Sequence, residues 1–492
     1  MGETVRLLAT DVGAESGRTV VGSFDGERLS LHEVHRFPNR PVEVAGTLHW
    51  DVLRLYSDML DGIRAAGRVS SVGVDTWGVD FGLLDRSGRL LGNPVHYRDR
   101  RTEGMLEEAF SRVPREEIYT RTGIQFLPIN TLYQLLALVV AGEPQLASAD
   151  RLLTMPALLA YWLTGTAADE FTDATTTQCF DPRANAWAWD LVERLAIPSR
   201  IFGEVVPPGT GLGRVRSGLG LGSIRVVAPG SHDTASAVAA VPFESGRPAA
   251  YVSSGTWSLV GLEVERPVIN EAALAANLTN EGGVAGTFRL LKNVMGLWLL
   301  QECRRAWADS GSDLSYEDLI RRAEAARPFA ALIDPDDDRL LRPGDMPARI
   351  AALSAGNGQT LQAEPGVIAR CVFESLALKY RWTIEQLEHV TGLEVGVIHV
   401  VGGGALNRLL CQMVADACGR RVVAGPVEAT AAGNLLVQAM ALGVLGSLRE
   451  GRELVRRSLA IDTYEPVSTE GWEDAWRRFQ TTQHSGAARR SA

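Results

Sequence analysis

Short apolar runs separated by turn residues open the chain and predict three consecutive strands. The first run is Val5–Asp11 and the second is Arg18–Phe24, with the small residues Gly13–Gly17 between them. Asp25-Gly26 is a hairpin signal, and the apolar residues that start at Leu29 indicate the third strand. The chain is therefore expected to begin with strands joined by tight turns.

Helical spacing of apolar residues appears next and predicts a helix over Asp51–Ala66. Ser71–Val74 has the composition of a buried strand and runs directly into Asp75. The Gly- and Pro-rich residues 207–223 are predicted to form a loop. Further elements are predicted as helices near Asn130–Ala141, Pro156–Leu163, Leu406–Cys418 and Ala429–Leu442, and as a short strand over Ile398–Val401.

The opening pattern returns in the second half of the chain. Ala249–Ser253 and Trp257–Glu263 read as strands, and Ser254-Gly255-Thr256 is the small-residue turn between them. A chain of 492 residues is too long for one ordinary core, so the repeat suggests two similarly built domains. We expect domains over residues 1–240 and 241–455 and an extension over 456–492, with disorder after Ser485.

Composition excludes several classes of protein. The net charge is −10 and no basic stripe is visible, which argues against nucleic-acid binding. The longest apolar run, around Leu135–Val140, is far too short to cross a membrane, and we find no signal peptide. The five cysteines are scattered without a Cys-x-x-Cys pair, which favours reduced thiols in a cytoplasmic protein.

The basic residues exclude one large class of nucleotide-binding proteins. Of 49 basic residues, only Lys292 and Lys379 are lysines, and neither follows a glycine. A P-loop NTPase needs a Gly-Lys-Ser/Thr segment, whose lysine contacts the phosphates. Any nucleotide must therefore be held by backbone N–H groups and small hydroxyls at glycine-rich turns.

A catalytic base for phosphoryl transfer can be nominated from the segment Gly230-Ser-His-Asp-Thr234. The segment follows an apolar strand, and small residues come after it, which places Asp233 at the start of a helix. The helix dipole keeps a carboxylate there ionised, as a general base requires. The alternative is that Asp233 merely caps the helix.

Other polar segments offer the remaining groups of a phosphoryl-transfer site. Asp11 ends the first strand and is the candidate for Mg²⁺, held through water, and Asp75 is a second candidate; each could instead simply end a strand and cap a turn. Gly13–Gly17 and Ser254–Thr256 could wrap phosphates or be ordinary hairpin turns. Gly402–Gly404 could let the backbone approach a flat ligand or serve only close packing. Asn293 and the segment around Trp77 and Asp80 could bind a sugar or belong to the core, and the histidines show no zinc-ligand spacing.

These segments together resemble the FGGY family of carbohydrate kinases, in order, from about residue 5 to 445. Two of them, Gly73-Val-Asp-Thr-Trp-Gly-Val-Asp-Phe81 and Asn277-Leu-Thr-Asn-Glu-Gly-Gly283, resemble the branch of the family that acts on L-rhamnulose. The other matching segments are Asp11-Val-Gly-Ala-Glu-Ser-Gly-Arg18, Tyr97-Arg-Asp-Arg-Arg-Thr102, Ser231-His-Asp-Thr-Ala-Ser-Ala237, Ser253-Ser-Gly-Thr-Trp-Ser258, Leu291-Lys-Asn-Val-Met-Gly-Leu-Trp-Leu-Leu-Gln301, Val400-Val-Gly-Gly-Gly404 and Gly425-Pro-Val-Glu-Ala429.

The resemblance implies an α/β fold of two actin-like, ribonuclease-H-like domains that face each other across an active-site cleft. It implies ATP-dependent phosphorylation of L-rhamnulose at O1 in L-rhamnose degradation, with Mg²⁺ as cofactor and Asp233 as proton acceptor. The first domain would bind the sugar, the second would bind the nucleotide, and the protein would be a monomer or homodimer. Residues that match ATP-binding positions of the family are Ala14, Glu15, Ser16, Gly17, Arg18, Thr256, Gln301 and Gly403. Residues that match sugar-binding positions are Gly78, His232, Asp233, Thr234 and Asn293.

One position departs from the family pattern. The first loop of the family usually reads Gly-Ala-Ser-Ser-Gly-Arg, whereas Glu15 replaces the first serine here. A carboxylate beside the γ-phosphate would repel it unless Glu15 points to solvent or helps to bind magnesium. Two alternatives to the L-rhamnulose activity stay open: a kinase for another ketose or a polyol, and a non-catalytic ATP- and sugar-binding sensor.

Overall fold

The structure is a computed structural model that describes residues 4–244 and 246–490, with side chains described up to residue 482. Within these residues the chain forms two compact units that interleave along the sequence. Unit 1 comprises the chain up to Phe243 together with Glu263–Leu291 and Glu428–Leu459. Unit 2 comprises Glu244–Leu262, Lys292–Val427 and the chain from Ala460 onwards. The predicted boundaries at residues 240 and 455 remain a prediction.

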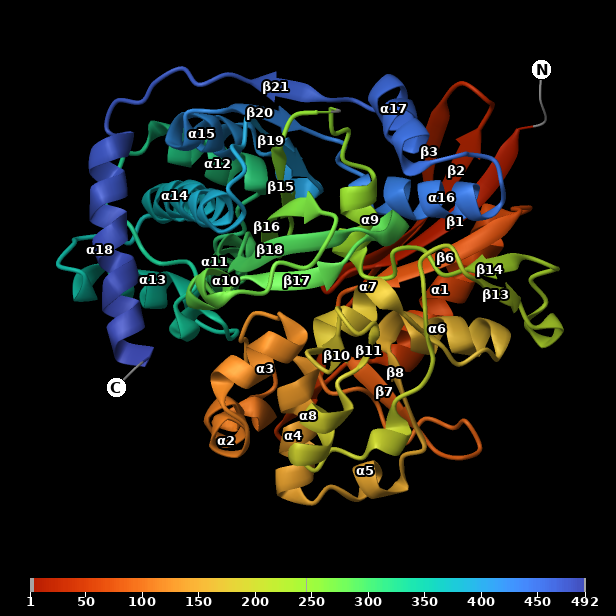
Figure 1. Cartoon of the computed structure of the whole chain (residues 1–492). Coiled ribbons are helices and arrows are strands. Elements are labelled where there is room, and N and C mark those ends of the chain that lie inside the picture. The colour runs from red at the N-terminus through yellow and green to blue at the C-terminus, as the bar shows by residue number, and fades with distance from the viewer. Residues whose placement is uncertain (1–3, 245, 491–492) are drawn as a thin grey trace. The chain divides into compact units, whose positions relative to one another are not determined.

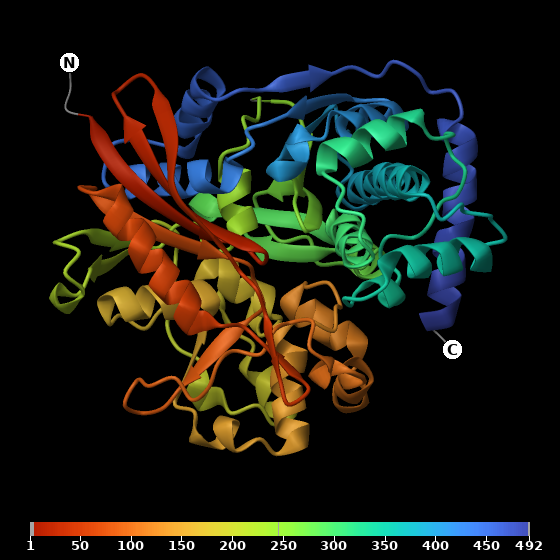
Figure 2. The same cartoon turned by 180° about the vertical axis from the view of Figure 1, so that it is seen from behind.

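Both strands and helices occur throughout the described residues, in runs of several strands or several helices, as Figures 1 and 2 show. The strands are β1 (Val5–Val12), β2 (Ser16–Phe24), β3 (Leu29–Pro38), β4 (Val42–Val44), β5 (Thr47–His49), β6 (Ser71–Thr76), β7 (Phe81–Leu84), β8 (Arg151–Thr154), β9 (Asp169–Glu170), β10 (Phe180–Asp181), β11 (Ala186–Trp187), β12 (Val205–Val206), β13 (Gly211–Arg214), β14 (Arg225–Val227), β15 (Ala249–Ser254), β16 (Trp257–Val264), β17 (Thr279–Gly282), β18 (Phe288–Met295), β19 (Val397–Val401), β20 (Arg421–Ala424) and β21 (Asp462–Tyr464). The α-helices are α1 (Val52–Ala66), α2 (Met105–Arg112), α3 (Arg115–Thr122), α4 (Thr131–Ala141), α5 (Pro144–Ser148), α6 (Met155–Thr164), α7 (Phe171–Ala174), α8 (Trp189–Arg194), α9 (Asp233–Ala239), α10 (Glu271–Ala275), α11 (Trp298–Asp309), α12 (Tyr316–Ala325), α13 (Met346–Gly356), α14 (Pro365–Thr391), α15 (Arg408–Cys418), α16 (Ala429–Ala441), α17 (Leu448–Ser458) and α18 (Trp472–Arg490).

The main sheet of unit 1 has the strand order β13-β14-β6-β1-β2-β3. The three predicted opening strands form its antiparallel part, β1-β2-β3. β6 lies parallel to β1 on the other side, so the carboxyl ends of these two strands meet at one edge. This arrangement brings Asp11 directly opposite Asp75.

Two helices cover opposite faces of this sheet, as the two views in Figures 1 and 2 show. Gly62 of α1 packs against Thr19, whereas Gly22 packs against Leu435 of α16. Since Thr19 and Gly22 are three positions apart on β2, their Cα–Cβ directions point to opposite faces. Each glycine is needed because a Cβ atom would lie 2.1 Å from the Thr19 hydroxyl or 2.6 Å from the Leu435 side chain.

α9, which starts at the candidate base, packs against α16. A Cβ atom at Gly433 would lie 1.7 Å from the carbonyl oxygen of Ser236, so only glycine allows the two helices to approach this closely. The small residues that follow Asp233 in the sequence are explained by this contact. They are buried between helices, and the position of Asp233 thereby depends on the fit of α9 against α16.

The second sheet repeats the topology of the first. Its strand order is β17-β18-β16-β15-β19-β20-β21, with β15 antiparallel to β16 and parallel to β19. Strand for strand, β21-β20-β19-β15-β16-β18 corresponds to β13-β14-β6-β1-β2-β3. The predicted internal repeat is therefore confirmed. β17 and the first residues of β18 belong to unit 1, and the remaining strands lie largely in unit 2.

The predicted loop over residues 207–223 is wrong in part. β13 lies within it and pairs antiparallel with β14, and a 3₁₀ turn follows over Ser217–Leu219. Leu212 is buried, which gives this glycine-rich edge strand one side chain to anchor it. Because glycine and proline are turn signals, the sequence pattern did not indicate a strand here. An edge strand, however, tolerates glycine.

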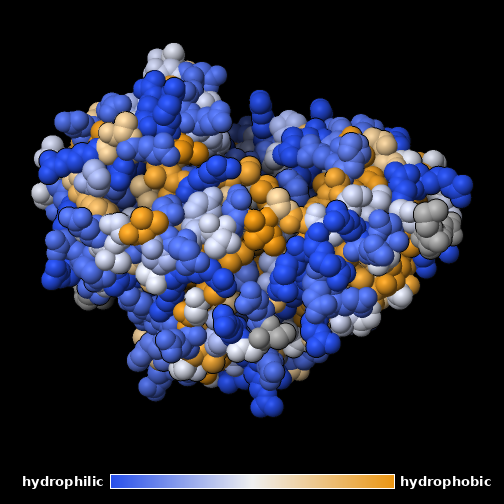
Figure 3. All heavy atoms as spheres, turned by 90° about the horizontal axis from the view of Figure 1, so that it is seen from above, coloured by the Kyte–Doolittle hydropathy of each residue, from blue (hydrophilic) through white to orange (hydrophobic). Residues whose placement is uncertain are grey.

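Large exposed apolar side chains are scattered over both units rather than gathered in one patch. In Figure 3, hydrophobic side chains of the face shown are interleaved with hydrophilic ones. Among the described residues, none of the helices combines the length and the apolar composition that crossing a membrane requires. The exposed large apolar residues are Val42, Val44, Leu53, Val140, Trp189, Leu393, Leu406 and Val467.

Candidate functional site

Asp233 is the first residue of α9, and His232 rather than Asp233 occupies the N-cap position. The Asp233 side chain is 29% exposed, so a substrate can reach it. Thr234 donates its hydroxyl to Asp233 Oδ1 at 3.1 Å. Burial is the main cause that raises the pKa of Asp233, and the charge of Asp11 adds to the rise. A carboxylate with a raised pKa accepts a proton more readily, which suits a general base.

The loop before Asp233 is anchored by hydrogen bonds to three elements that lie far from it in the sequence, β6, β9 and α7. Ser231 accepts a hydrogen bond from Thr76 N at 2.9 Å and donates its own N–H to Glu170 Oε2 at 2.9 Å. His232 N donates to Thr172 Oγ1 at 3.2 Å. No spacing signal in the sequence could have found Glu170 and Thr172, because the fold alone brings β9 and α7 to this loop.

Two buried strand-end carboxylates, Asp11 and Asp75, lie opposite each other beside this loop. Asn434 of α16 donates to Asp75 Oδ2. Burial raises the pKa of Asp75 well above its usual value, and the charge of Asp11 adds to this rise while Asn434 opposes it. The charge of Asp233 contributes to the same rise. The three acidic side chains therefore influence one another at the ends of β1 and β6 and the start of α9.

These carboxylates fit a magnesium ion that keeps most of its water. Oxygen donors are the ligands that Mg²⁺ prefers, and Asp75 Oδ1 is buried without a hydrogen-bond partner among the described residues. Among the side chains that the structure describes, no group of three or more His, Cys, Asp or Glu residues could hold a metal ion by itself. The arrangement is thus compatible with the prediction that Asp11 binds the ion through water.

Arg18 is neutralised by two carboxylates in this structure. Its guanidinium lies 2.8 Å from Asp11 Oδ2 and 2.7 Å from Glu428 Oε2. Burial opposes its charge, but Asp11 and Glu428 outweigh burial and raise the pKa of Arg18. Arg18 therefore orients Asp11, and its predicted contact with ATP remains a prediction.

The predicted phosphate turn between β1 and β2 is tightly closed. Gly13 N donates to Ser16 O at 3.1 Å, and Asn39 holds the turn through Glu15 O and Gly13 O at 2.9 Å each. A Cβ atom at Gly17 would lie 2.1 Å from the Phe37 ring, which explains the glycine there. Ala14, Glu15 and Ser16 are all half-buried at this turn.

The segment after β6 gives Gly78 and Asp80 different surroundings. A Cβ atom at Gly78 would lie 2.9 Å from the hydroxyl oxygen of Thr176, so the chain passes that side chain closely. Asp80 is completely buried and accepts hydrogen bonds from the indole N–H of Trp50 and of Trp77 and from Gln134. Burial raises the pKa of Asp80 to about 6. Asp80 is thus an internal hydrogen-bonding centre that shapes the Trp77 segment.

Three of the four residues of unit 2 that were predicted to bind ATP or the sugar lie at or beside the turn between β15 and β16. The carbonyls of Gly255 and Thr256, in the turn between β15 and β16, accept hydrogen bonds from Leu297 and Trp298 at the start of α11. Gln301 follows one turn later in α11, and its Oε1 is buried without a hydrogen-bond partner among the described residues. An unpaired buried oxygen is costly, and a ligand amino group or hydroxyl would satisfy it.

The glycine segment after β19 packs on the same turn. A Cβ atom at Gly404 would lie 2.0 Å from the Ser254 hydroxyl, and Gly402 has a positive φ of 81°. Gly403 between them is exposed. Close packing therefore explains Gly402 and Gly404, while Gly403 is the residue that remains accessible to a ligand. Asn293, the fourth predicted residue, lies half-buried on β18.

The two lysines of the chain lie together in unit 2. Lys379 Nζ is 2.9 Å from Asp334 Oδ1 and 3.0 Å from Asp336 Oδ2. Lys379 and Lys292 each lie against the ring of Trp382, at 5.0 and 5.4 Å from its centroid. Both lysines are buried, with 2% and 6% of their surface exposed.

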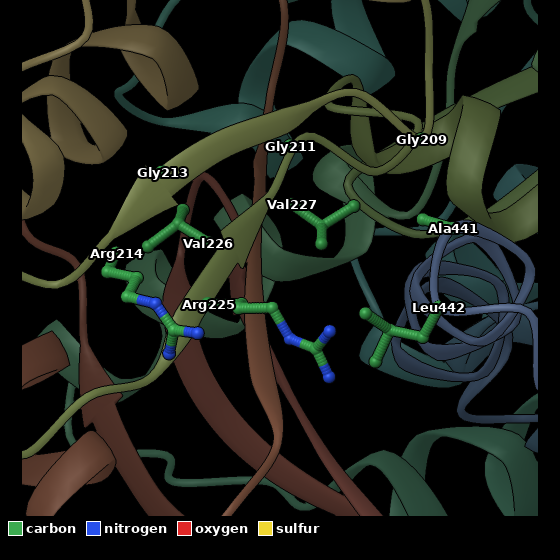
Figure 4. A pocket seen from close by; sticks show the side chains of 9 residues that line it. All are labelled: Gly209, Gly211, Gly213, Arg214, Arg225, Val226, Val227, Ala441 and Leu442. Carbon is green, nitrogen blue, oxygen red and sulfur yellow. The ribbon is translucent and has the colours of Figure 1, made fainter.

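A pocket of about 330 Å³ lies in unit 1 beside β13 and β14 (Figure 4). Arg214 and Arg225 are partners across the two strands, and Figure 4 shows both guanidinium groups on the same side of the strands. None of its lining residues is a predicted site residue, so the pocket is separate from the candidate active site. The lining residues are Gly209, Gly211, Gly213, Arg214, Arg225, Val226, Val227, Ala441 and Leu442.

Asp173, in the same buried region as Glu170, gives a test of the electrostatics of unit 1. Burial raises its pKa well above the usual value, and the charges of Glu170 and Asp169 add to the rise. In the unfolded chain the carboxyl group of Asp173 loses its proton near pH 4, whereas in the folded chain it keeps this proton to higher pH. Stability is therefore lost as pH rises from about 4 toward the raised pKa, by up to about 1.4 kcal/mol per pH unit.

We expect Asp173→Asn to remove this loss. The melting temperature of the variant should exceed that of the wild type at pH 8 by more than it does at pH 5, as thermal unfolding would measure. The exposed Asp61→Asn serves as control and should show no such trend. An equal difference at both pH values would contradict the burial of a proton on Asp173.

Profiles of one protein family match nearly the whole chain. The N-terminal domain of the FGGY family of carbohydrate kinases matches residues 6–240, and the C-terminal domain of that family matches residues 250–442.

Curated proteins named rhamnulokinase are similar to the chain over almost its full length. The one from Bacteroides thetaiotaomicron is 44% identical over 482 residues, which are 96% of this chain and 98% of that protein. The one from Oceanobacillus iheyensis is 41% identical over 471 residues, which are 94% of this chain and 99% of that protein.

Solved structures of sugar and polyol kinases share the fold. A gluconate kinase from Lactobacillus acidophilus has a TM-score of 0.78 at 16% identity, with 99% of this chain and 98% of that chain covered. A Plasmodium falciparum glycerol kinase with ADP has a TM-score of 0.77 at 17% identity, with 99% of both chains covered. The predicted α/β fold of two actin-like domains is thereby confirmed.

Proposed function

Since this chain belongs to the FGGY family of carbohydrate kinases, we propose that it is the kinase that converts L-rhamnulose and ATP into L-rhamnulose 1-phosphate and ADP, in L-rhamnose degradation. The observation that carries the choice of sugar is the 41–44% identity to rhamnulokinases over at least 94% of this chain. The segments around Trp77 and Glu281 support the same choice, because they resemble the L-rhamnulose branch of the family.

In the proposed reaction, Asp233 accepts the proton of the sugar's primary hydroxyl group. The oxygen of that hydroxyl group attacks the γ-phosphorus of ATP in line. The exposed edge of the Asp233 carboxylate and its raised pKa support this role. The bond from oxygen to phosphorus forms, the bond from phosphorus to the ADP oxygen breaks, and the proton stays on Asp233. Gly78, His232, Thr234 and Asn293 are the proposed sugar contacts.

The residues proposed to bind ATP are Ala14, Glu15, Ser16, Gly17 and Arg18 at the turn of unit 1 and Thr256, Gln301 and Gly403 in unit 2. The unsatisfied Gln301 oxygen and the exposed Gly403 support this assignment. Asp11, held by Arg18, is proposed to bind Mg²⁺ through water, with Asp75 beside it. When bound, magnesium offsets the charge of the ATP phosphates.

We also propose that the enzyme works in the cytoplasm, as a monomer or homodimer. All five cysteines are free thiols, and four of them are buried. Such thiols suit a reducing compartment.

A substrate panel tests the proposed activity. Purified protein with MgATP should release ADP fastest with L-rhamnulose, and the product should carry its phosphate at C1, as coupling between phosphorus and carbon in NMR would show. D-xylulose, D-gluconate and glycerol serve as controls for the family alternatives. Faster ADP release with one of these compounds would identify that compound as the substrate instead of L-rhamnulose. No ADP release with any compound would favour the non-catalytic sensor.

A further inference from the structure

A chain of three polar side chains leads from the hairpin of β17 and β18 to the proposed base. Glu281 and Arg289 are direct partners across the hairpin, with Arg289 Nη2 at 3.1 Å from Glu281 Oε2. The same Nη2 lies 3.1 Å from His232 Nδ1. On the other side of the ring, His232 Nε2 lies 3.5 Å from Asp233 Oδ1. The imidazole is thus the link between a buried ion pair and the proposed base.

The guanidinium of Arg289 is fixed in place. It is completely buried, and its Nε donates to the carbonyl oxygen of Gly282 at 2.8 Å. This bond sets the plane of the guanidinium and therefore the direction of Nη2. Glu281, only 3% exposed, supplies the negative charge that makes a buried arginine tolerable.

The contact with Arg289 favours one of the two positions for the proton on His232. A guanidinium only donates hydrogen bonds and never accepts them. In this contact His232 Nδ1 is therefore the acceptor, which places the proton on Nε2. Glu281 Oε2 lies 3.3 Å from the same Nδ1 and would favour the other position. Arg289 Nη2 lies closer to Nδ1, at 3.1 Å, and its guanidinium is held by Gly282 O.

We propose that Glu281 and Arg289 are positioning residues that hold the His232 ring with Nδ1 as the acceptor and a proton on Nε2. This rests on the proposed function, in which Asp233 is the base. In that state Nε2–H donates to Asp233 or to the attacking hydroxyl oxygen of the sugar. The ring has no open nitrogen to take the sugar's proton, so the proton goes to Asp233. In this proposal, Glu281 of the Asn-Glu-Gly-Gly segment holds Arg289 in place, a role that the sequence alone did not indicate.

Nitrogen NMR of protein labelled at histidine with ¹⁵N tests the proposal directly. At neutral pH the wild type should show His232 with a protonated Nε2 and an unprotonated Nδ1, with the signals assigned by their loss in His232→Gln. Arg289→Met should shift the proton toward Nδ1, where Glu281 Oε2 lies 3.3 Å away and can accept it. Arg289→Lys should keep the wild-type tautomer, because lysine also only donates.

Kinetics give a second readout. In Arg289→Met, kcat/KM for the ketose should fall by about 10–100-fold, the range known for groups that orient the histidine ligands of metal ions, while the dissociation constant for ATP changes less than about twofold. Arg289→Lys should recover part of this loss.

Arg452→Met is the matched control. Arg452 pairs with Glu263 at 2.8 Å, is equally part of unit 1, and donates to the carbonyl of Val238 near the end of α9. Its loss should lower stability without moving the His232 proton. A wild-type spectrum with a protonated Nδ1 would overturn the proposal, even if Arg289→Met does not fold. If no sugar is phosphorylated by the wild type, the proposed function fails, whereas the spectrum still decides the tautomer.

Discussion

Replacement of Asp233 by asparagine should lower kcat for sugar-dependent ADP release by about 10²–10⁴-fold, the usual contribution of a general base. Asparagine keeps the size of the side chain and can still contact Thr234, but it cannot accept a proton. The acidic limb of the wild-type pH–rate profile should vanish in the variant. Because burial raises the pKa of Asp233, that limb should lie at higher pH than an ordinary aspartate would give.

Binding measurements separate this loss from misfolding. The melting temperature and the dissociation constant for ATP of Asp233→Asn should stay close to those of the wild type, because the side chain is partly exposed. Asp173→Asn, the same chemical change at a buried carboxyl of unit 1, should keep its activity within about threefold. A rate for Asp233→Asn within about tenfold of the wild type would rule out Asp233 as the base.

Lys379→Met should destabilise unit 2 by about 3–5 kcal/mol, the usual cost of removing one partner from a buried ion pair. Lys379 is the cation between Asp334 and Asp336, and its removal leaves two largely buried carboxylates facing each other. Burial alone would lower the pKa of Lys379, but these two charges outweigh burial and raise it. The ammonium is thus an integral part of the fold around β18, where Asp336 also accepts a hydrogen bond from Met295 N.

Chemical denaturation followed by tryptophan fluorescence measures this effect, since Trp382 contacts Lys379. Arg321→Met, which removes a mostly exposed partner of Asp318, should change stability far less. Asp334→Asn combined with Asp336→Asn in the Lys379→Met background should recover part of the loss. A cost below about 1 kcal/mol for Lys379→Met would show that the carboxylates are solvated or protonated instead.

Local patterns were sufficient to predict the central strands of both sheets and several of the helices, whereas long helices such as α14 were not predicted. Alternation and turn residues placed the three opening strands, and the helix over Asp51–Ala66 was predicted within one residue of α1. The repeat at Ala249–Ser253 predicted the second sheet, because both halves use the same sequence of strand, turn and strand. The strand β13 was missed, since two of its four residues, Gly211 and Gly213, are glycines and its only buried side chain is Leu212.

The site was predictable only where its residues stand in contiguous motifs. Asp233 and its neighbours could be found because they follow one another in the chain. Asn434, which fixes Asp75, and Glu428, which shares Arg18 with Asp11, come from the other end of the sequence. Their roles arise from the packing of α16 on the first sheet, and no spacing rule connects residues that lie hundreds of positions apart.

Arg18 was predicted to contact ATP, and in the structure it forms ion pairs with Asp11 and Glu428. Its place after the phosphate turn suggested a cation for ATP. The structure adds that its charge is already balanced by Asp11 and Glu428. A positively charged contact with phosphate would therefore require at least one of these carboxylates to be neutralised, which is what a magnesium ion near Asp11 would do.

The burial of both lysines has a consequence for the surface chemistry of the folded protein. Amine-directed acylation, cross-linking by aldehydes, and enzymatic acetylation or ubiquitination all need an accessible ε-amino group. In the folded chain Lys292 and Lys379 present almost none of theirs, so lysine modification is a reaction of opened molecules. The rate of lysine modification should follow the local or global opening of unit 2. Measuring this rate would therefore show how often that unit unfolds.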